Sequence, residues 1–211
     1  MPMNRLRVRQ WMEDALMWPG RLNPLRRDCI MNLRILEFTD KNGSRLFAQP
    51  MVLHRCADRG RRIQVCAREM FKEQCHCCEA NNLARRRGDR EPFKTDVRYV
   101  VNAVEIDSNS QIVKLFVLPK VVFLKIADSA LTAKGAHVFE AEKGQIFSIG
   151  WYGEGLNTRY SIKLLSAKHP IDGDTVEQVV DPLTEMKHLD FEFECNTSFC
   201  NQCCKYPLGK E

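Results

Sequence analysis

The order of apolar and polar positions divides the chain into short β-strands and a few helices. Apolar and polar residues alternate over residues 32–38 and 45–53, and turn-forming residues occupy 40–43 between them. This pattern predicts a β-hairpin. A second hairpin is expected from residues 99–106 and 112–118, where β-branched and aromatic residues dominate.

A helix and two further strands follow these hairpins. Pro119 suits the first turn of a helix, and the next residues carry one apolar face, formed by Val122, Phe123, Ile126, Ala130 and Leu131. Strands are expected over residues 145–151 and 158–165. The order strand, strand, helix, strand, strand predicts a mainly β protein with short helices, built on a barrel of the OB type.

The chain divides into three parts by composition. Residues 1–31 form a basic N-terminal arm in which 4–17 are amphipathic, 32–168 form the core, and 169–211 form an acidic, cysteine-containing tail. The longest apolar runs are far shorter than the ~20 residues of a membrane-spanning helix. The first residues alternate arginine with apolar residues, unlike a secretory signal, so we expect a cytoplasmic protein.

Charge is distributed unevenly, although the net value is only +5. Residues 1–94 contain 20 basic and 11 acidic residues, whereas residues 169–211 contain 3 basic and 9 acidic residues. A basic front half favours a polyanionic partner, and an acidic tail can compete for the same surface.

Ten cysteines in a reducing compartment indicate metal binding before disulfides. His54, Cys66, Cys75 and Cys78 follow the spacing H-x11-C-x8-C-x2-C, which suits a closed, structural Zn²⁺ site. Such an ion would stabilise a segment that is too polar to form a conventional core. Cys56 in place of His54 is chemically acceptable, and unrelated reduced cysteines are the alternative to a metal site.

A second cysteine cluster lies near the C-terminus. Cys195, Cys200 and Cys203 follow C-x4-C-x2-C, and His188 or Cys204 could supply a fourth ligand to a second zinc ion. The alternative is a tail that carries reduced thiols without a metal.

A protein that binds single strands without sequence preference needs cations along the phosphates and aromatic faces for the bases. The candidate cations are Arg55, Arg59, Arg61, Arg62, Arg85, Arg86, Arg87, Lys114 and Lys120. The chain has only four tyrosines, so the candidate stacking residues are Tyr99, Phe116, Trp151, Tyr152 and Tyr160.

Together these motifs resemble the helix-destabilising single-stranded DNA-binding proteins of T-even and related phages. The resemblance covers roughly residues 32–168. It rests on the ordered zinc ligands, a helical stretch at 79–84, Tyr99-Val100-Val101-Asn102, Val113-Lys114, Pro119-Lys120, and Trp151 with Gly153 and Gly155. It implies an OB fold with a zinc subdomain at about 54–94 and a basic cleft. It also implies self-association along DNA through the arm, and a tail that recruits replication and recombination proteins.

The sequence lacks the motifs of common enzymes, including the P-loop, the H-E-x-x-H metalloprotease motif and the zinc-deaminase signature. We therefore expect a non-enzymatic protein that coats single-stranded DNA during phage replication, recombination and repair. The alternatives are a zinc-dependent transcription regulator that binds duplex DNA and a zinc-stabilised protein-interaction adaptor.

Overall fold

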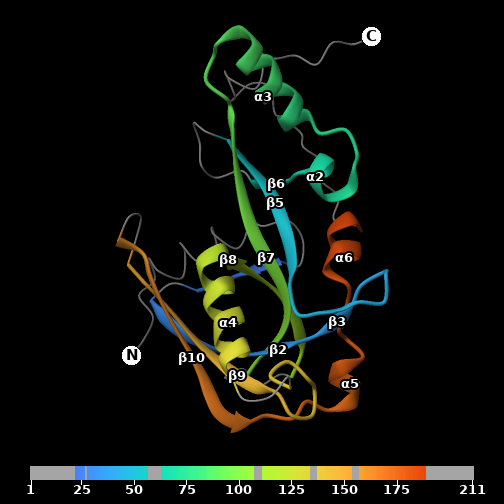
Figure 1. Cartoon of the computed structure of the whole chain (residues 1–211), viewed down its shortest axis with the longest axis vertical. Helices are drawn as coiled ribbons and strands as arrows, with labels where there is room; N and C mark the ends of the chain where they lie inside the picture. Colours follow the sequence, from blue (N-terminus) through green and yellow to red (C-terminus); the bar gives the residue numbers. More distant parts are fainter. Residues whose placement is uncertain are drawn as a thin grey trace.

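The computed structural model describes residues 22–26, 28–56, 63–106, 111–133, 137–153 and 157–188, which form a mainly β protein (Figure 1). The predicted amphipathic stretch at 4–17 lies outside these residues. The strands are β1 (Leu22–Pro24), β2 (Cys29–Leu36), β3 (Phe38–Thr39), β4 (Arg45–Leu46), β5 (Gln49–Cys56), β6 (Ile63–Val65), β7 (Phe93–Glu105), β8 (Val113–Pro119), β9 (Gln145–Tyr152) and β10 (Arg159–Lys168).

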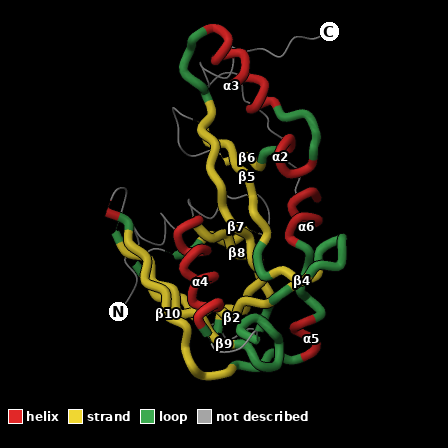
Figure 2. The backbone as a smooth tube through the Cα atoms, in the orientation of Figure 1, coloured by secondary structure: helices red, strands yellow, loops and turns green. Residues whose placement is uncertain are grey.

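Short helices connect the strands, as Figure 2 shows. They are α2 (Ala67–Phe71), α3 (His76–Arg87), α4 (Lys120–Thr132), α5 (Gly173–Val176) and α6 (Pro182–His188). The predicted helix after Pro119 is confirmed as α4, with Pro119 at its N-cap. Among the described segments, no helix has both the length and the apolar character that crossing a membrane requires.

Strand β7 is long enough to take part in two regions of one sheet. Its first half pairs with β5 from Phe93 to Val100, and its second half pairs with β8 from Arg98 to Val104 and with β2 near Glu105. The main sheet has the order β1-β8-β7-β2-β9-β10, while β5 and β6 extend away from it as a ribbon (Figure 1). The predicted pairing of residues 99–106 with 112–118 is confirmed.

The predicted hairpin of residues 32–38 and 45–53 is wrong in its pairing. Only Phe38–Thr39 and Arg45–Leu46 pair, because both edges of β2 are taken by β7 and β9. The turn between them is held by Asp40, whose carboxylate accepts hydrogen bonds from the backbone N–H groups of Asn42 (2.9 Å) and Ser44 (2.8 Å). These bonds lower the pKa of Asp40.

The two faces of the main sheet have different coverings. Odd-numbered residues of β2, such as Leu33 and Ile35, point to the inner face and form the largest core with Val122 and Ile126 of α4. Helix α4 lies across this face between β10 and the β7–β8 pair. Within the described residues, the edge strands β1 and β10 do not pair with each other, so the sheet is open and the predicted closed barrel is not seen.

The segment after β10 covers part of the outer face. Ile171, Val176 and Val179 pack against Leu36 and Val104, while Met186 of α6 is fully buried in another core cluster. The expected boundary at residue 169 therefore does not mark the end of the packed structure. Likewise, the expected N-terminal arm of residues 1–31 includes β1 and the beginning of β2.

Asn102 attaches this C-terminal segment to the centre of the sheet. Its buried amide donates to the carbonyl of Val180 (2.8 Å) and accepts from the N–H of Val180 (3.2 Å). The side chain therefore acts as one more backbone partner and satisfies groups that would be costly to bury unpaired.

Arg34 performs a similar task on the outer face of β2. Its guanidinium is fully buried and donates to the backbone carbonyls of His169 (3.0 Å) and Ile35 (2.6 Å), among others. The remaining acceptors are the carbonyls of Val138, Glu140 and Ala141. Burial lowers the pKa of Arg34 to about 10, so the group stays charged at neutral pH. Two separate segments, residues 138–141 and the residues around His169, are thereby held to one strand.

We expect Arg34→Ala to lower the free energy of unfolding by about 3 kcal/mol or more, because several buried carbonyls lose their donor. Urea-induced unfolding followed by fluorescence measures this change. The control is Arg45→Ala, which removes an exposed ion pair with Glu37 and should cost less than about 1 kcal/mol. Equal losses in the two variants would show that the Arg34 cluster does not stabilise the fold.

Candidate metal centre

The β5–β6 hairpin supplies two of the four candidate ligands. His54 lies on β5 opposite Gln64 of β6 and Thr95 of β7, and its side chain is buried. Cys66 follows β6 directly and is the N-cap of α2, where its sulfur accepts a hydrogen bond from the N–H of Glu69 (3.4 Å). Strand pairing therefore fixes the positions from which these ligands reach the site.

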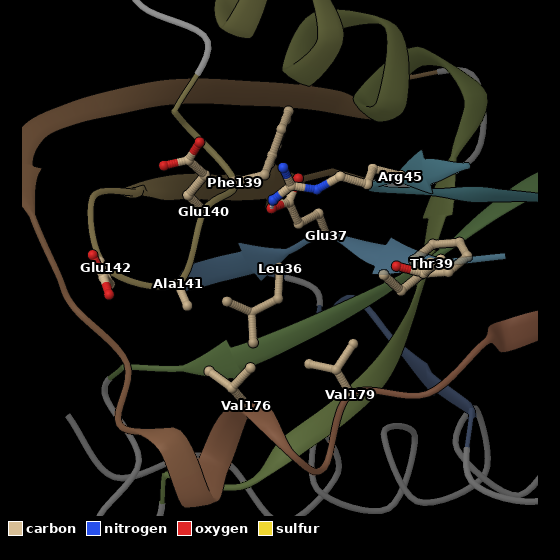
Figure 3. A pocket seen from close by; sticks show the side chains of 11 residues that line it. Leu36, Glu37, Thr39, Arg45, Phe139, Glu140, Ala141, Glu142, Val176 and Val179 are labelled. Atoms are coloured by element: carbon tan, nitrogen blue, oxygen red, sulfur yellow. Dashed lines mark hydrogen bonds and ion pairs between the residues drawn. The ribbon is translucent and has the colours of Figure 1, made fainter. Parts of the chain in front are cut away.

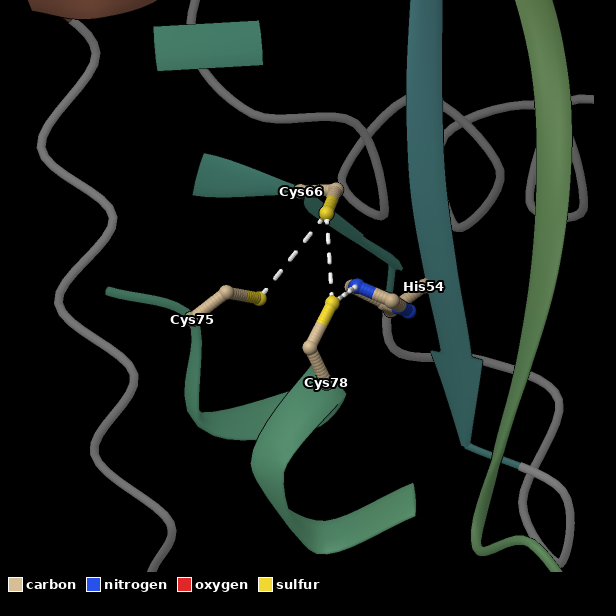
Figure 4. Close-up of side chains that lie close together, drawn as sticks. All are labelled: His54, Cys66, Cys75 and Cys78. Carbon is tan, nitrogen blue, oxygen red and sulfur yellow. Dashed lines mark hydrogen bonds between the residues drawn. The ribbon is translucent and has the colours of Figure 1, made fainter. Parts of the chain in front are cut away.

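Helix α3 supplies the other two ligands from its first turn. Cys75 is the N-cap and Cys78 lies three residues later, so both sulfurs lie near the positive end of the helix. The Sγ of Cys66 lies 4.0 Å from that of Cys75 and 3.5 Å from that of Cys78 (Figure 4). The Sγ of Cys78 lies 3.4 Å from Nε2 of His54.

These distances fit a single tetrahedral metal ion. Metal–ligand bonds of the length that zinc prefers place two sulfurs about 3.8 Å apart, and a sulfur and a nitrogen about 3.5 Å apart. All four candidate ligand atoms lie within 4.8 Å of one another. Two neighbouring residues of ligand type do not belong to the cluster. His76 is exposed, and the thiol of Cys77 donates a hydrogen bond to Oε1 of Gln64 (3.1 Å). The predicted ligand set can thus hold a metal ion.

The three thiols differ in acidity because their surroundings differ. The neighbouring Cys77 side chain, with a smaller contribution from His54, lowers the pKa of Cys75. Burial raises the pKa of the Cys66 and Cys78 thiols. A raised pKa favours the protonated thiol, so an ion that binds these two sulfurs must displace their protons.

The module around the cluster has little apolar material of its own. Its core consists largely of the cysteines, two alanines of α3 and Phe93 of β7. Asn81 ties α3 to β7, since its buried amide donates to the carbonyl of Phe93 (2.8 Å) and accepts from the N–H of Phe93 (3.0 Å). A bound metal ion would add to the stability of a core this small.

We expect metal affinity to fall as the pH falls, because protons compete with the ion for the sulfurs of Cys66 and Cys78. The raised pKa of these two thiols gives the sign, so the logarithm of the affinity should rise with pH near neutrality. Competition with a chromophoric chelator over the range from about pH 6 to about pH 8 measures this pH dependence.

Two variants assign this pH dependence to the cluster. Cys66→Ser should lower the metal content by one ion per chain, whereas Cys29→Ser should leave it unchanged because Cys29 lies on β2, outside the cluster. A metal content that is the same in Cys66→Ser and the wild type would exclude the site.

The predicted phosphate-binding cations have different environments. Arg85, Arg86 and Arg87 are exposed at the C-terminal end of α3, and Arg85 forms an ion pair with Glu91 (2.7 Å). Lys120 is exposed at the first turn of α4. Arg59, Arg61 and Arg62 lie outside the described residues, as do Cys195, Cys200, Cys203 and the side chain of His188 from the predicted second metal site.

Two further predicted cations have carboxylate partners, as Arg85 does. Arg55 forms an ion pair with Asp96 (2.9 Å), and Lys114 lies 4.0 Å from Glu105. Each would have to share its charge between this carboxylate and a bound phosphate, and both are less exposed than the arginines of α3.

The predicted stacking residues lie on different faces of the sheet. Phe116 is 2% exposed and belongs to the core, so its assignment as a base-stacking residue is wrong. The ring of Tyr99 stacks on Phe123 at 3.7 Å. Trp151 and Tyr160 lie 5.7 Å apart and pack partly against the core.

Tyr152 differs from these aromatic residues because it points to the outer face and is 42% exposed. Sequence reasoning missed the cations beside it, Arg159 and Lys163 of β10, both of which are exposed. The alternation of Arg159, Ser161 and Lys163 with apolar residues is the signal that marks them as one solvent-facing row.

A separate pocket of about 370 Å³ lies between the β3–β4 hairpin and α5, and Figure 3 shows its lining. Its floor is apolar, with Leu36, Val176 and Val179. Two carboxylates at its rim already have partners, since Glu37 pairs with Arg45 and Oε1 of Glu140 lies 2.5 Å from Nδ1 of His137. Because these two carboxylates already have partners within the protein, we assign the pocket no ligand.

No protein-family model matches this chain, and a comparison with curated proteins also finds no match. The functional argument therefore rests on the geometry of the metal centre and on the surfaces around it.

Proposed function

We propose that this protein coats single-stranded DNA without marked sequence preference, as a helix-destabilising protein of the type its sequence resembles. One observation carries the proposal. The exposed arginines lie at the end of α3. This helix belongs to the module at the end of the β5–β7 ribbon, and the ribbon continues directly into the main sheet. Cations on a rigid, extended platform suit the regularly spaced phosphates of a single strand.

The proposed metal is Zn²⁺, in a structural role. Three cysteines and one histidine are the donor types that zinc prefers, and four protein ligands leave no position for a reactive water. The ion would fix the start of α3 against β5 and the residue after β6. It would therefore act on DNA binding indirectly, by holding the arginines in place.

The proposed platform is an open form of the OB barrel. Strands β2, β7, β8, β9 and β10 occur in the expected chain order, with α4 between the third and fourth of them. Helix α4 packs against β7, β8 and β10, where it covers the opening that a closing strand pair would seal. The metal module is inserted between β2 and β7, in keeping with the predicted subdomain at about 54–94.

The proposed path of the strand follows one face of the β5–β7 ribbon. Phe93 lies beneath α3 and Tyr99 beneath α4, while Thr95 and Val97 between them are exposed on the same face. Lys120 lies at the α4 end and Arg86 at the α3 end of this stretch. A backbone entering between these two helices would meet cations on both sides.

The family resemblance supports two further parts of the proposal. The acidic residues of 169–211 would recruit replication and recombination proteins, and the basic residues of 1–31 would support self-association along DNA. Both expectations concern mainly residues outside the described part of the chain.

We expect Arg86→Ala/Arg87→Ala to weaken binding to labelled oligo-dT at least fivefold and to reduce the salt dependence. Each lost phosphate contact lowers the slope of log affinity against log salt by about 0.7. Fluorescence anisotropy at several salt concentrations measures both quantities. The control is Lys41→Ala/Lys143→Ala, which removes two exposed cations from turns outside the metal module.

Three outcomes would contradict the proposal. Equal or stronger binding to duplex DNA of the same length would favour a transcription regulator. A lack of binding to any nucleic acid at low salt would favour an interaction adaptor. Loss of affinity in the control variant equal to that in the arginine variant would remove the metal module from the binding surface.

A further inference from the structure

Half of the outer face of the main sheet has no covering among the described residues. Residues 138–144 and the segment after β10 cover the other half, through Arg34, Leu36 and Val104. Toward the β9–β10 turn, the same face continues with exposed side chains. They are Ile30 on β2, Tyr152 on β9, and Arg159, Ser161 and Lys163 on β10.

Strand register arranges these side chains in rows. Tyr152 is directly opposite Arg159, Gly150 is opposite both Ile30 and Ser161, and Ser148 is opposite Lys163. Directly opposed residues share a face, so the aromatic ring, the isoleucine and both cations form one surface. Arg159 and Lys163 are about 13 Å apart along the strand.

Gly150 determines how the ring of Tyr152 lies. A Cβ atom at position 150 would come within 2.5 Å of the Tyr152 hydroxyl and 2.6 Å of its ring. The ring therefore occupies the space above the glycine, while the residue as a whole is 42% exposed. An exposed ring beside two cations has the two features that a base and its flanking phosphates require.

We infer that this surface, formed by Ile30, Gly150, Tyr152, Arg159 and Lys163, is a second contact site for the single strand, in which a base stacks on Tyr152. The inference rests on the proposed function and extends it from the metal module to the outer face of β9 and β10. The charge of this surface favours a polyanion, since Arg159 and Lys163 both face outward. The carboxylate of Asp28, whose backbone N–H bonds the carbonyl of Trp151, lies at its margin.

Stacking gives the expected size of the effect. Tyr152→Ala should weaken binding to oligo-dT by about fivefold to 100-fold, the loss that one stacked base contributes. Tyr152→Phe should bind like the wild type because it keeps the ring. Gly150→Ala should lose affinity although every aromatic residue is present, because the added methyl group displaces the ring.

An abasic oligonucleotide of equal length separates stacking from a structural effect. Against this probe, Tyr152→Ala and the wild type should differ less than about twofold, since no base is available to stack. Leu131→Ala is the control, because Leu131 is 86% exposed at the end of α4 on the inner side of the sheet. Its affinity for oligo-dT should equal that of the wild type.

The outcomes distinguish this inference from the proposed function. If Tyr152→Ala and Arg159→Ala/Lys163→Ala both bind oligo-dT like the wild type while Arg86→Ala/Arg87→Ala binds weakly, the second contact site is overturned and the proposed function stands. An equal loss of affinity for abasic and normal strands in Tyr152→Ala would also overturn it. If the wild type binds no single strand, both fall together.

Discussion

The continuous pairing of β7 is the constraint on which the rest of the structure depends. Its first half holds the ribbon that carries the metal ligands, and its second half lies in the middle of the main sheet. A polar module with a core made mostly of cysteine could not hold a fixed orientation by itself. The shared strand gives it one, and under the proposed function the metal–ligand bonds would keep α3 folded against that strand.

Backbone-like hydrogen bonds from buried side chains complete this arrangement. Asn81 joins α3 to β7, Asn102 joins the C-terminal segment to β7, and Arg34 joins two segments to β2. Each bonds buried backbone groups, at positions where an unpaired polar group is costly. Among the described residues, these contacts leave the arginines at the end of α3 exposed and one half of the outer sheet face without a covering.

The local features of this architecture could be predicted from the sequence. Spacing identified His54, Cys66, Cys75 and Cys78 as candidate metal ligands, because metal geometry constrains the type and number of ligands. The pattern of apolar residues located the strands of the β7–β8 and β9–β10 pairs. Long-range choices could not be read in the same way. The partners of β2, the open edge at β10 and the burial of Phe116 depend on contacts between residues distant in sequence, for which a local pattern gives no signal.

The central claim is that a metal-folded module positions the cations that bind a single strand. Anisotropy titrations of labelled oligo-dT with the metal-loaded protein and with the same protein after chelation test it directly, with far-ultraviolet circular dichroism recorded on both. The account predicts at least tenfold weaker binding after chelation, with the signal of the sheet retained and some helical signal lost. Equal affinity in the two states, with the same circular dichroism, would contradict it.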